Sequence, residues 1–219
     1  EIYTFSLHDA LPISSSYAIF SCFMALAMAG VIRSRENKRW LILSHIAITF
    51  AFISHGVEAL ILPFVSVIAY CILANDRKLF TEFFTWPGGI LFTVIFSGFY
   101  FVALMLINPQ VIHFMHCQNH AYTFGGIFGV AVISFLSFAP FHGFILRALW
   151  EVFPREFPAQ KSTDLFFLVW SVIFALAALA AHDLFLLSAS VPALAAMLGG
   201  RLDAWLEQKN FASIGYAVI

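Results

Sequence analysis

The sequence predicts an all-α protein, a polytopic transmembrane helix bundle with about seven or eight spans. Of the 219 residues, 62% are hydrophobic and only 11% are charged, whereas soluble proteins carry roughly 25% charged residues. The apolar residues gather in runs near the length of about 20 that a helix needs to cross a bilayer. These runs do not alternate as barrel strands would, and a bilayer forces backbone groups to pair internally, which favours helices.

The first segment, residues 1–14, is unlike the rest of the chain. Its SLHDALPI stretch back-translates as TCC CTA CAC GAC GCT CTT CCG ATC, which resembles the end of a common sequencing adapter. We therefore expect residues 1–14 to be an artefact and exclude them from fold reasoning. On this interpretation residues 15–219 are a partial transmembrane domain, with sequence expected to be missing at both ends. The alternative is a genuine N-terminus with a His8–Asp9 pair.

Apolar runs then define the spans in order. The predicted spans cover residues 16–32, 40–54, 57–74, 87–107, 125–149, 165–181 and 184–200, with an eighth beginning near Phe211. The second and seventh runs are short or interrupted by polar residues. The amphipathic stretch 202–210 is predicted to be a connecting turn.

All eleven Lys and Arg residues fall on one side of this alternation of spans. They occur in or directly beside the connections that follow the first, third, fifth and seventh spans. By the positive-inside rule that side is cytoplasmic. The net charge of −1 gives no reason to expect a nucleic-acid partner, and the three scattered cysteines imply no disulfide framework.

The opposite face carries the polar groups that could form a site. Its loops hold His55, His113, His116, His120 and His182, together with the acids Glu58 and Asp183. Each alone is an ordinary loop residue, but polar groups gathered at span ends often mark a functional site. Glu58 and Asp183 could equally stabilise helix N-termini.

Four segments in order resemble one family. They are KRWLILSHIAITFAFISHGVEALILP, WPGGILFTVIFSGFYFVALMLINPQVIHFMHCQNHAYTF, LSFAPFHGFILRALW and FLVWSVIFALAALAAHDLFLLSASVPALAAMLGGRLDAW. Together they resemble the polyprenyl-phosphate-sugar-dependent glycosyltransferases of the GT-C superfamily, which include lipid A aminoarabinose transferase and protein O-mannosyltransferase-like enzymes. The resemblance covers about residues 17–206.

The resemblance implies a multi-pass enzyme of the bacterial inner membrane. Such enzymes move a sugar from a polyprenyl-phosphate carrier to a lipid, glycan or protein acceptor on the outer face, with inversion at the anomeric carbon. An acidic residue in the first outer loop acts as base, and here it is expected upstream of Ser16. The resemblance does not fix a cofactor, and a divalent cation is one option that it allows.

Residue by residue, the resemblance places Asn119 and His120 near the carrier phosphate. His55 stands where the family has the Lys of its "tKGp" motif, and His182 stands where a Lys or Arg is common. The Arg of the family's middle loop is Thr123 here. These replacements have two interpretations. Either the chain belongs to a divergent subfamily that uses another sugar donor, or its phosphate site is weakened.

The remaining histidines carry alternative interpretations. His113, His116 and His120 would share one face of a helix, where three imidazoles could bind zinc or another transition metal. The alternative is a loop in which the three histidines lie apart, and Pro109 favours it because proline disfavours a helix interior. His45 and His142 lie in or near spans and are predicted to form hydrogen bonds between helices.

Two other functions compete with the glycosyltransferase. PFHGF at 140–144 faintly resembles a motif of antiporter-like respiratory subunits, which favours a transporter or ion-translocating subunit, although mid-span charges are absent. The histidines favour a metal- or haem-binding membrane protein, although they concentrate in one loop. Binding of a polyprenyl-phosphate sugar, ion flux and metal content would separate the three.

Overall fold

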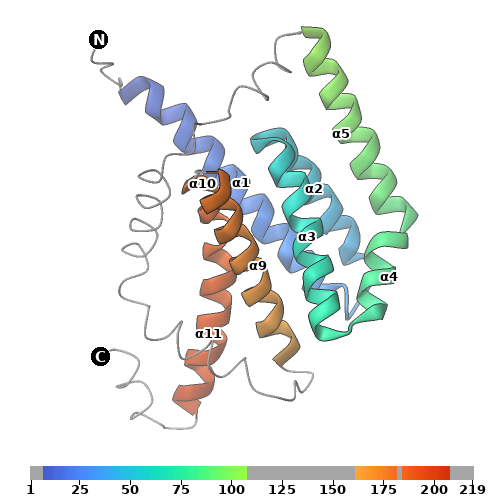
Figure 1. Cartoon of the computed structure of the whole chain (residues 1–219), viewed down its shortest axis with the longest axis vertical. Coiled ribbons are helices and arrows are strands. Elements are labelled where there is room, and N and C mark those ends of the chain that lie inside the picture. Colours follow the sequence, from blue (N-terminus) through green and yellow to red (C-terminus); the bar gives the residue numbers. More distant parts are fainter. Residues whose placement is uncertain (1–6, 108–160, 182–183, 208–219) are drawn as a thin grey trace. The chain divides into compact units, whose positions relative to one another are not determined.

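The computed structural model describes residues 7–107, 161–181 and 184–207, and this part of the chain is helical without any strand (Figure 1). The all-α prediction is therefore confirmed for these residues. The helices are α1 (Leu7–Arg33), α2 (Trp40–His55), α3 (Val57–Ala74), α4 (Arg77–Thr85), α5 (Pro87–Ile107), α9 (Lys161–Ala181), α10 (Leu184–Ser188) and α11 (Val191–Glu207).

Three of the described helical segments are long and apolar enough to cross a membrane: Val57–Ala74, Pro87–Ile107 and Thr163–Ala181. Ala18–Arg33 and Trp40–His55 are shorter apolar helices. These five segments match predicted spans, whereas the spans predicted at 125–149 and near Phe211 lie outside the described residues.

The exposed face of α5 supports a membrane environment. Seven large apolar residues of this helix are each more than half exposed, namely Leu91, Val94, Ile95, Phe99, Val102, Leu106 and Ile107. The polar Thr93 and Ser97 of the same helix are buried instead. Contiguous apolar surface of this kind is rare on soluble monomers, and lipid tails would cover it.

The region predicted as the seventh span differs from the prediction. Two helices, α10 and α11, replace the single span 184–200, with a turn at Ala189 and Ser190. Pro192 explains the break, because proline has no amide hydrogen for an intrahelical bond but is tolerated in a first turn. The Ser190 amide and hydroxyl both donate to the Leu187 carbonyl, at 2.9 and 2.6 Å. α11 then continues to Glu207, so the predicted turn at 202–210 is wrong for its first six residues.

The segment between the third and fourth spans also folds further than expected. It forms α4, a helix of nine residues that buries Leu79 and Phe83 on one face. Its sequence, RKLFTEFFT, is too short and too polar to be a span. The only sign of a helix in it is the spacing of four residues between Leu79 and Phe83.

Local backbone chemistry sets the helix ends. α2 passes into α3 through Gly56 alone, whose φ of 102° is open to glycine but strained for other residues. α3 ends at Ala74 and is followed by Asn75, whose φ of 51° allows the Asp76 amide to donate to the Cys71 carbonyl at 3.0 Å. Asn is the usual alternative to Gly at this left-handed position.

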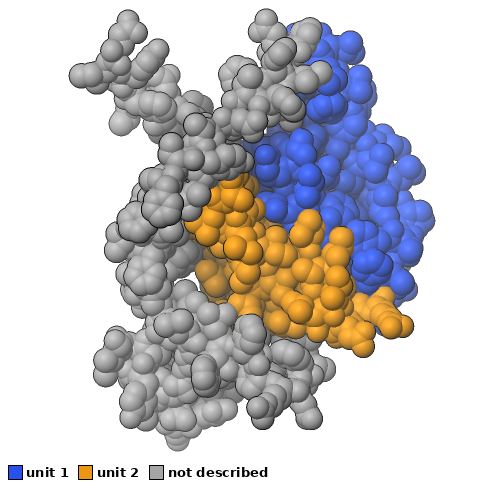
Figure 2. All heavy atoms as spheres, in the orientation of Figure 1, with its two compact units in different colours: residues 1–64, 78–118 blue, residues 65–77, 119–219 orange. Residues whose placement is uncertain are grey.

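The chain divides into two compact units, residues 1–64 with 78–118 and residues 65–77 with 119–219 (Figure 2). In the first unit α2 contacts both α1 and α5. α1 and α2 run antiparallel, since Phe20 stacks on His55 while Phe23 stacks on Phe50. Gly30 of α1 lies so close to α2 that a Cβ atom on it would be 2.8 Å from the Ser44 amide nitrogen.

In the second unit an aromatic column organises the core. Phe166, Trp170 and Phe174 follow one face of α9, with ring centroids 5.7 and 5.2 Å apart. The Trp170 indole donates to the Ala189 carbonyl at 3.3 Å, and Arg201 of α11 pairs with Asp164 of α9. These contacts make α9 and α11 antiparallel neighbours.

Candidate functional site

A buried polar cluster joins α2 to α5 inside the first unit. The His45 Nδ1 atom lies 3.2 Å from the Thr93 Oγ1 atom, and the Thr49 hydroxyl donates to the His45 carbonyl at 2.8 Å. His45 is fully buried and Thr93 nearly so. The predicted interhelical hydrogen bond of His45 is therefore confirmed. Because Thr93 also accepts from Thr49 at 3.5 Å, three side chains and one carbonyl form a single network.

Aromatic rings and one glycine enclose the His45 imidazole. Phe83 stacks on it with ring centroids 4.9 Å apart, and Phe64 and Trp86 contact it at 6.0 and 6.5 Å. On the α5 side Gly89 allows the ring to touch the helix backbone, since a Cβ there would lie 2.2 Å from His45 Cδ2. His45 Nε2 has no hydrogen-bond partner of good geometry among the described residues.

A cavity of about 210 Å³ opens at the other end of α2. Its wall on one side is the last turn of α2 with Gly56, and on the other side it is the turn of α5 around Tyr100 and Leu104. The lining residues are Phe52, Ile53, Ser54, His55, Gly56, Tyr100, Phe101 and Leu104. The cavity is mostly apolar, with a few polar groups, as ligand sites usually are.

The polar groups of the cavity differ in what they can offer a ligand. The Gly56 amide donates to the Phe52 carbonyl at 2.8 Å and the Ser54 hydroxyl to the Ala51 carbonyl at 2.8 Å. The Tyr100 hydroxyl makes only a long bond of 3.5 Å to the Ile53 carbonyl. The Tyr100 hydroxyl is therefore the least engaged of these groups, and the His55 imidazole lines the same cavity, so both side chains are of a type that can donate to an anion. Phe20 stacks on His55 at 4.3 Å and limits the orientations of its ring.

One predicted site residue, His55, lies in this cavity. The other predicted residues, Asn119, His120 and His182 for the carrier phosphate and His113 and His116 for a metal, lie outside the described residues. Among the residues that the structure describes, no group of three His, Cys, Asp or Glu side chains could bind a metal ion. Glu58 lies in the first turn of α3, where its charge is favourable to the helix N-terminus.

Sequence reasoning missed the contribution of α5. Thr93, Ser97 and Tyr100 recur at intervals of four and three residues within an otherwise apolar span. That spacing places them on one helix face. The structure directs this face toward α2, where it meets the His45 cluster at one end and the cavity at the other.

No protein-family model, curated protein or solved structure matches this chain. Of the two polar features, the cavity holds the residue that the sequence motifs single out.

Proposed function

We propose that the chain is part of a polyprenyl-phosphate-dependent glycosyltransferase of the GT-C type, with seven or eight spans. It belongs in the bacterial inner membrane, with the Lys and Arg connections cytoplasmic and the His55 end of α2 facing outward. The supporting observation is that His55 lines a cavity at the end of the apolar helices. The motif resemblance assigns the same position to a cation at the carrier phosphate.

The chemistry explains why a donor is needed there. In the proposed reaction an acceptor oxygen attacks the anomeric carbon, the bond from that carbon to the phosphate oxygen breaks, and polyprenyl phosphate leaves with the electron pair. A carboxylate takes the proton of the acceptor hydroxyl, and the family resemblance puts that carboxylate ahead of residue 16. Donors directed at the leaving phosphate stabilise its developing charge. His55 and Tyr100 would supply such donors, and the apolar wall would contact the carrier chain.

Replacing His55 tests this assignment by binding. We expect His55→Ala to weaken binding of radiolabelled undecaprenyl phosphate about tenfold or more, since a hydrogen bond to a charged group contributes about 1.5–3 kcal/mol. His55→Lys restores a permanent cation and should retain or strengthen binding. The measurement is equilibrium binding to the full chain in nanodiscs.

Thr85→Ala is the matched control, because Thr85 is exposed at the end of α4 and does not line the cavity. Unchanged affinity is expected for it. Equal affinities for the parent, His55→Ala and His55→Lys proteins would remove His55 from the carrier site.

A second candidate function, ion translocation, is favoured by His45. A titratable side chain fully buried between two helices is typical of proton pathways in membrane proteins, and His45 is such a residue. If this candidate is correct, proteoliposomes containing the chain should collapse an imposed pH gradient and His45→Gln should abolish that flux. A rate equal to that of protein-free vesicles would reject it.

A further inference from the structure

Basic side chains lie along the α1–α2 connection and at the start of α4, two segments of the first unit that the Lys38–Glu82 ion pair joins. We call this surface the basic rim; it consists of Arg33, Arg35, Lys38, Arg39 and Lys78. The only carboxylates in the same segments, residues 33–39 and 78–85, are Glu36 and Glu82. Five cations against two anions leave the rim with a net charge of +3.

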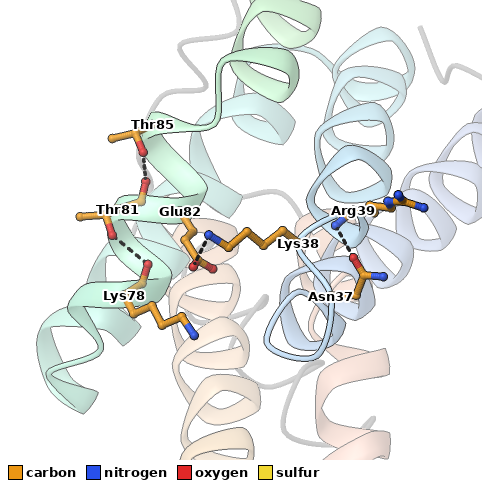
Figure 3. A network of polar contacts seen from close by, with 7 residues as sticks. All are labelled: Asn37, Lys38, Arg39, Lys78, Thr81, Glu82 and Thr85. Atoms are coloured by element: carbon orange, nitrogen blue, oxygen red, sulfur yellow. Dashed lines mark hydrogen bonds and ion pairs between the residues drawn. The ribbon is translucent and has the colours of Figure 1, made fainter.

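Two ion pairs join parts of the rim. Lys38 Nζ contacts Glu82 Oε1 at 2.9 Å and so ties the α1–α2 connection to α4 (Figure 3). Arg33 pairs with Glu36 at 3.0 Å within the connection. No carboxylate of the described residues pairs with Arg39 or Lys78. Their charges remain available to a partner.

Local hydrogen bonds and buried side chains hold the α1–α2 connection and α4 in place. The Asn37 side chain accepts a hydrogen bond from the Arg39 amide at 3.0 Å, which shapes the start of α2. Leu79 and Phe83 are buried under α4, while Lys78, Thr81 and Thr85 are exposed on it. The hydroxyls of Thr81 and Thr85 donate to carbonyls one turn earlier (Figure 3).

Aromatic side chains accompany the charges. Trp40 at the start of α2 and Phe80 on α4 are 42% and 41% exposed. Phe84 contacts Phe80 with ring centroids 4.9 Å apart, and Trp86 directly precedes α5. Exposed Trp residues beside basic residues at the end of apolar helices are typical of the membrane interface.

We propose that the basic rim is a binding site for anionic lipids, with the phosphate group of phosphatidylglycerol or a related lipid as its ligand. α4 connects two helices that are each long and apolar enough to cross a membrane, so both of its ends lie at a bilayer surface. Arg39 and Lys78 extend to different sides of the rim (Figure 3), so they attract anionic headgroups through the summed positive charge of the rim and do not share one phosphate, while the aromatic side chains contact the upper acyl chains. Charge complementarity and continuity with the bilayer favour lipid over a soluble partner. Clusters of basic residues next to spans bind anionic headgroups in this way.

The test measures lipid affinity for the full chain purified in a neutral detergent. Native mass spectrometry would follow titration with dioleoyl phosphatidylglycerol and, separately, with dioleoyl phosphatidylcholine. We expect preference for the anionic lipid, and about a fivefold loss of affinity for each cation removed, since one basic residue near an anionic surface contributes about 1 kcal/mol. The double variant Arg39→Gln/Lys78→Gln should therefore bind about 25-fold more weakly.

Two further variants test the same site independently of the double variant, again through lipid affinity. Glu36→Gln removes an anion from the rim and should strengthen binding, whereas Thr81→Ala changes the exposed face of α4 without a charge and should have no effect. Equal affinity for the two lipids would overturn the proposal. Unchanged preference in both the double variant and Glu36→Gln would also overturn it, because the lipid would then bind elsewhere.

Discussion

Gly30→Ala should separate α1 from α2 and lower the thermal stability of the chain substantially. The added Cβ would lie 2.8 Å from the Ser44 amide nitrogen and 2.9 Å from the Trp40 carbonyl oxygen. Helical geometry joins these two atoms by a hydrogen bond, and backbone atoms cannot move aside as a flexible side chain could. The helices must therefore shift apart, at a cost of about 1–3 kcal/mol or more.

The measurement is the apparent unfolding temperature in one detergent at a fixed heating rate, since unfolding of such proteins is often irreversible. For a chain of this length, each kcal/mol of lost stability lowers the unfolding temperature by about 2–4 °C. Gly199→Ala is the matched control, because a Cβ at that helical position meets nothing within 4 Å. Its unfolding temperature should stay equal or rise slightly, as Ala favours helix over Gly. Equal behaviour of the two variants would contradict the close approach of α1 and α2.

Gly89→Ala should disrupt the His45 cluster. The new Cβ would lie 2.2 Å from His45 Cδ2 and 2.7 Å from Trp86 Cε3. The imidazole has no room to retreat without losing its stacking on Phe83 and its hydrogen bond to Thr93. We expect a loss of stability near the upper end of the range for overpacking, about 3 kcal/mol.

A double-mutant cycle with His45→Ala isolates this clash. His45→Ala alone should also destabilise, because it empties a buried site. The double variant Gly89→Ala/His45→Ala should be more stable than the sum of the single effects, since the methyl group then occupies space left by the imidazole. Gly98→Ala, where a Cβ meets nothing within 4 Å, should be nearly neutral. Strict additivity of the two changes would show that the glycine is not required by the imidazole.

The spans of the described region were predictable because a bilayer imposes length and hydropathy on each helix separately. Val57–Ala74 and Pro87–Ile107 were predicted at the same bounds that the structure gives. α4 was not predicted, since a helix of nine residues is stabilised by burying Leu79 and Phe83 against other elements and not by its own propensity. The break before α11 had a local signal in Pro192 that the apolar run concealed.

Some residues of the candidate site could likewise be predicted from the sequence, and others could not. The sequence could single out His55 from its place at a span end and from the motif around it, and it could assign His45 to an interhelical hydrogen bond. It could not identify Thr93 as the partner of His45, nor Tyr100 as the residue opposite His55. Those residues are more than 40 positions away in the chain.

By itself, then, the sequence determined which apolar segments of the described region form helices, because composition and run length act on each segment alone. Only the tertiary structure decided which faces meet. Contact between α2 and α5 depends on how side chains and glycines from distant segments fit together, as Gly89 and His45 illustrate. Such fitting is a property of pairs of helices, so the cavity at His55, the buried cluster at His45 and the basic rim became visible only once the helices were packed.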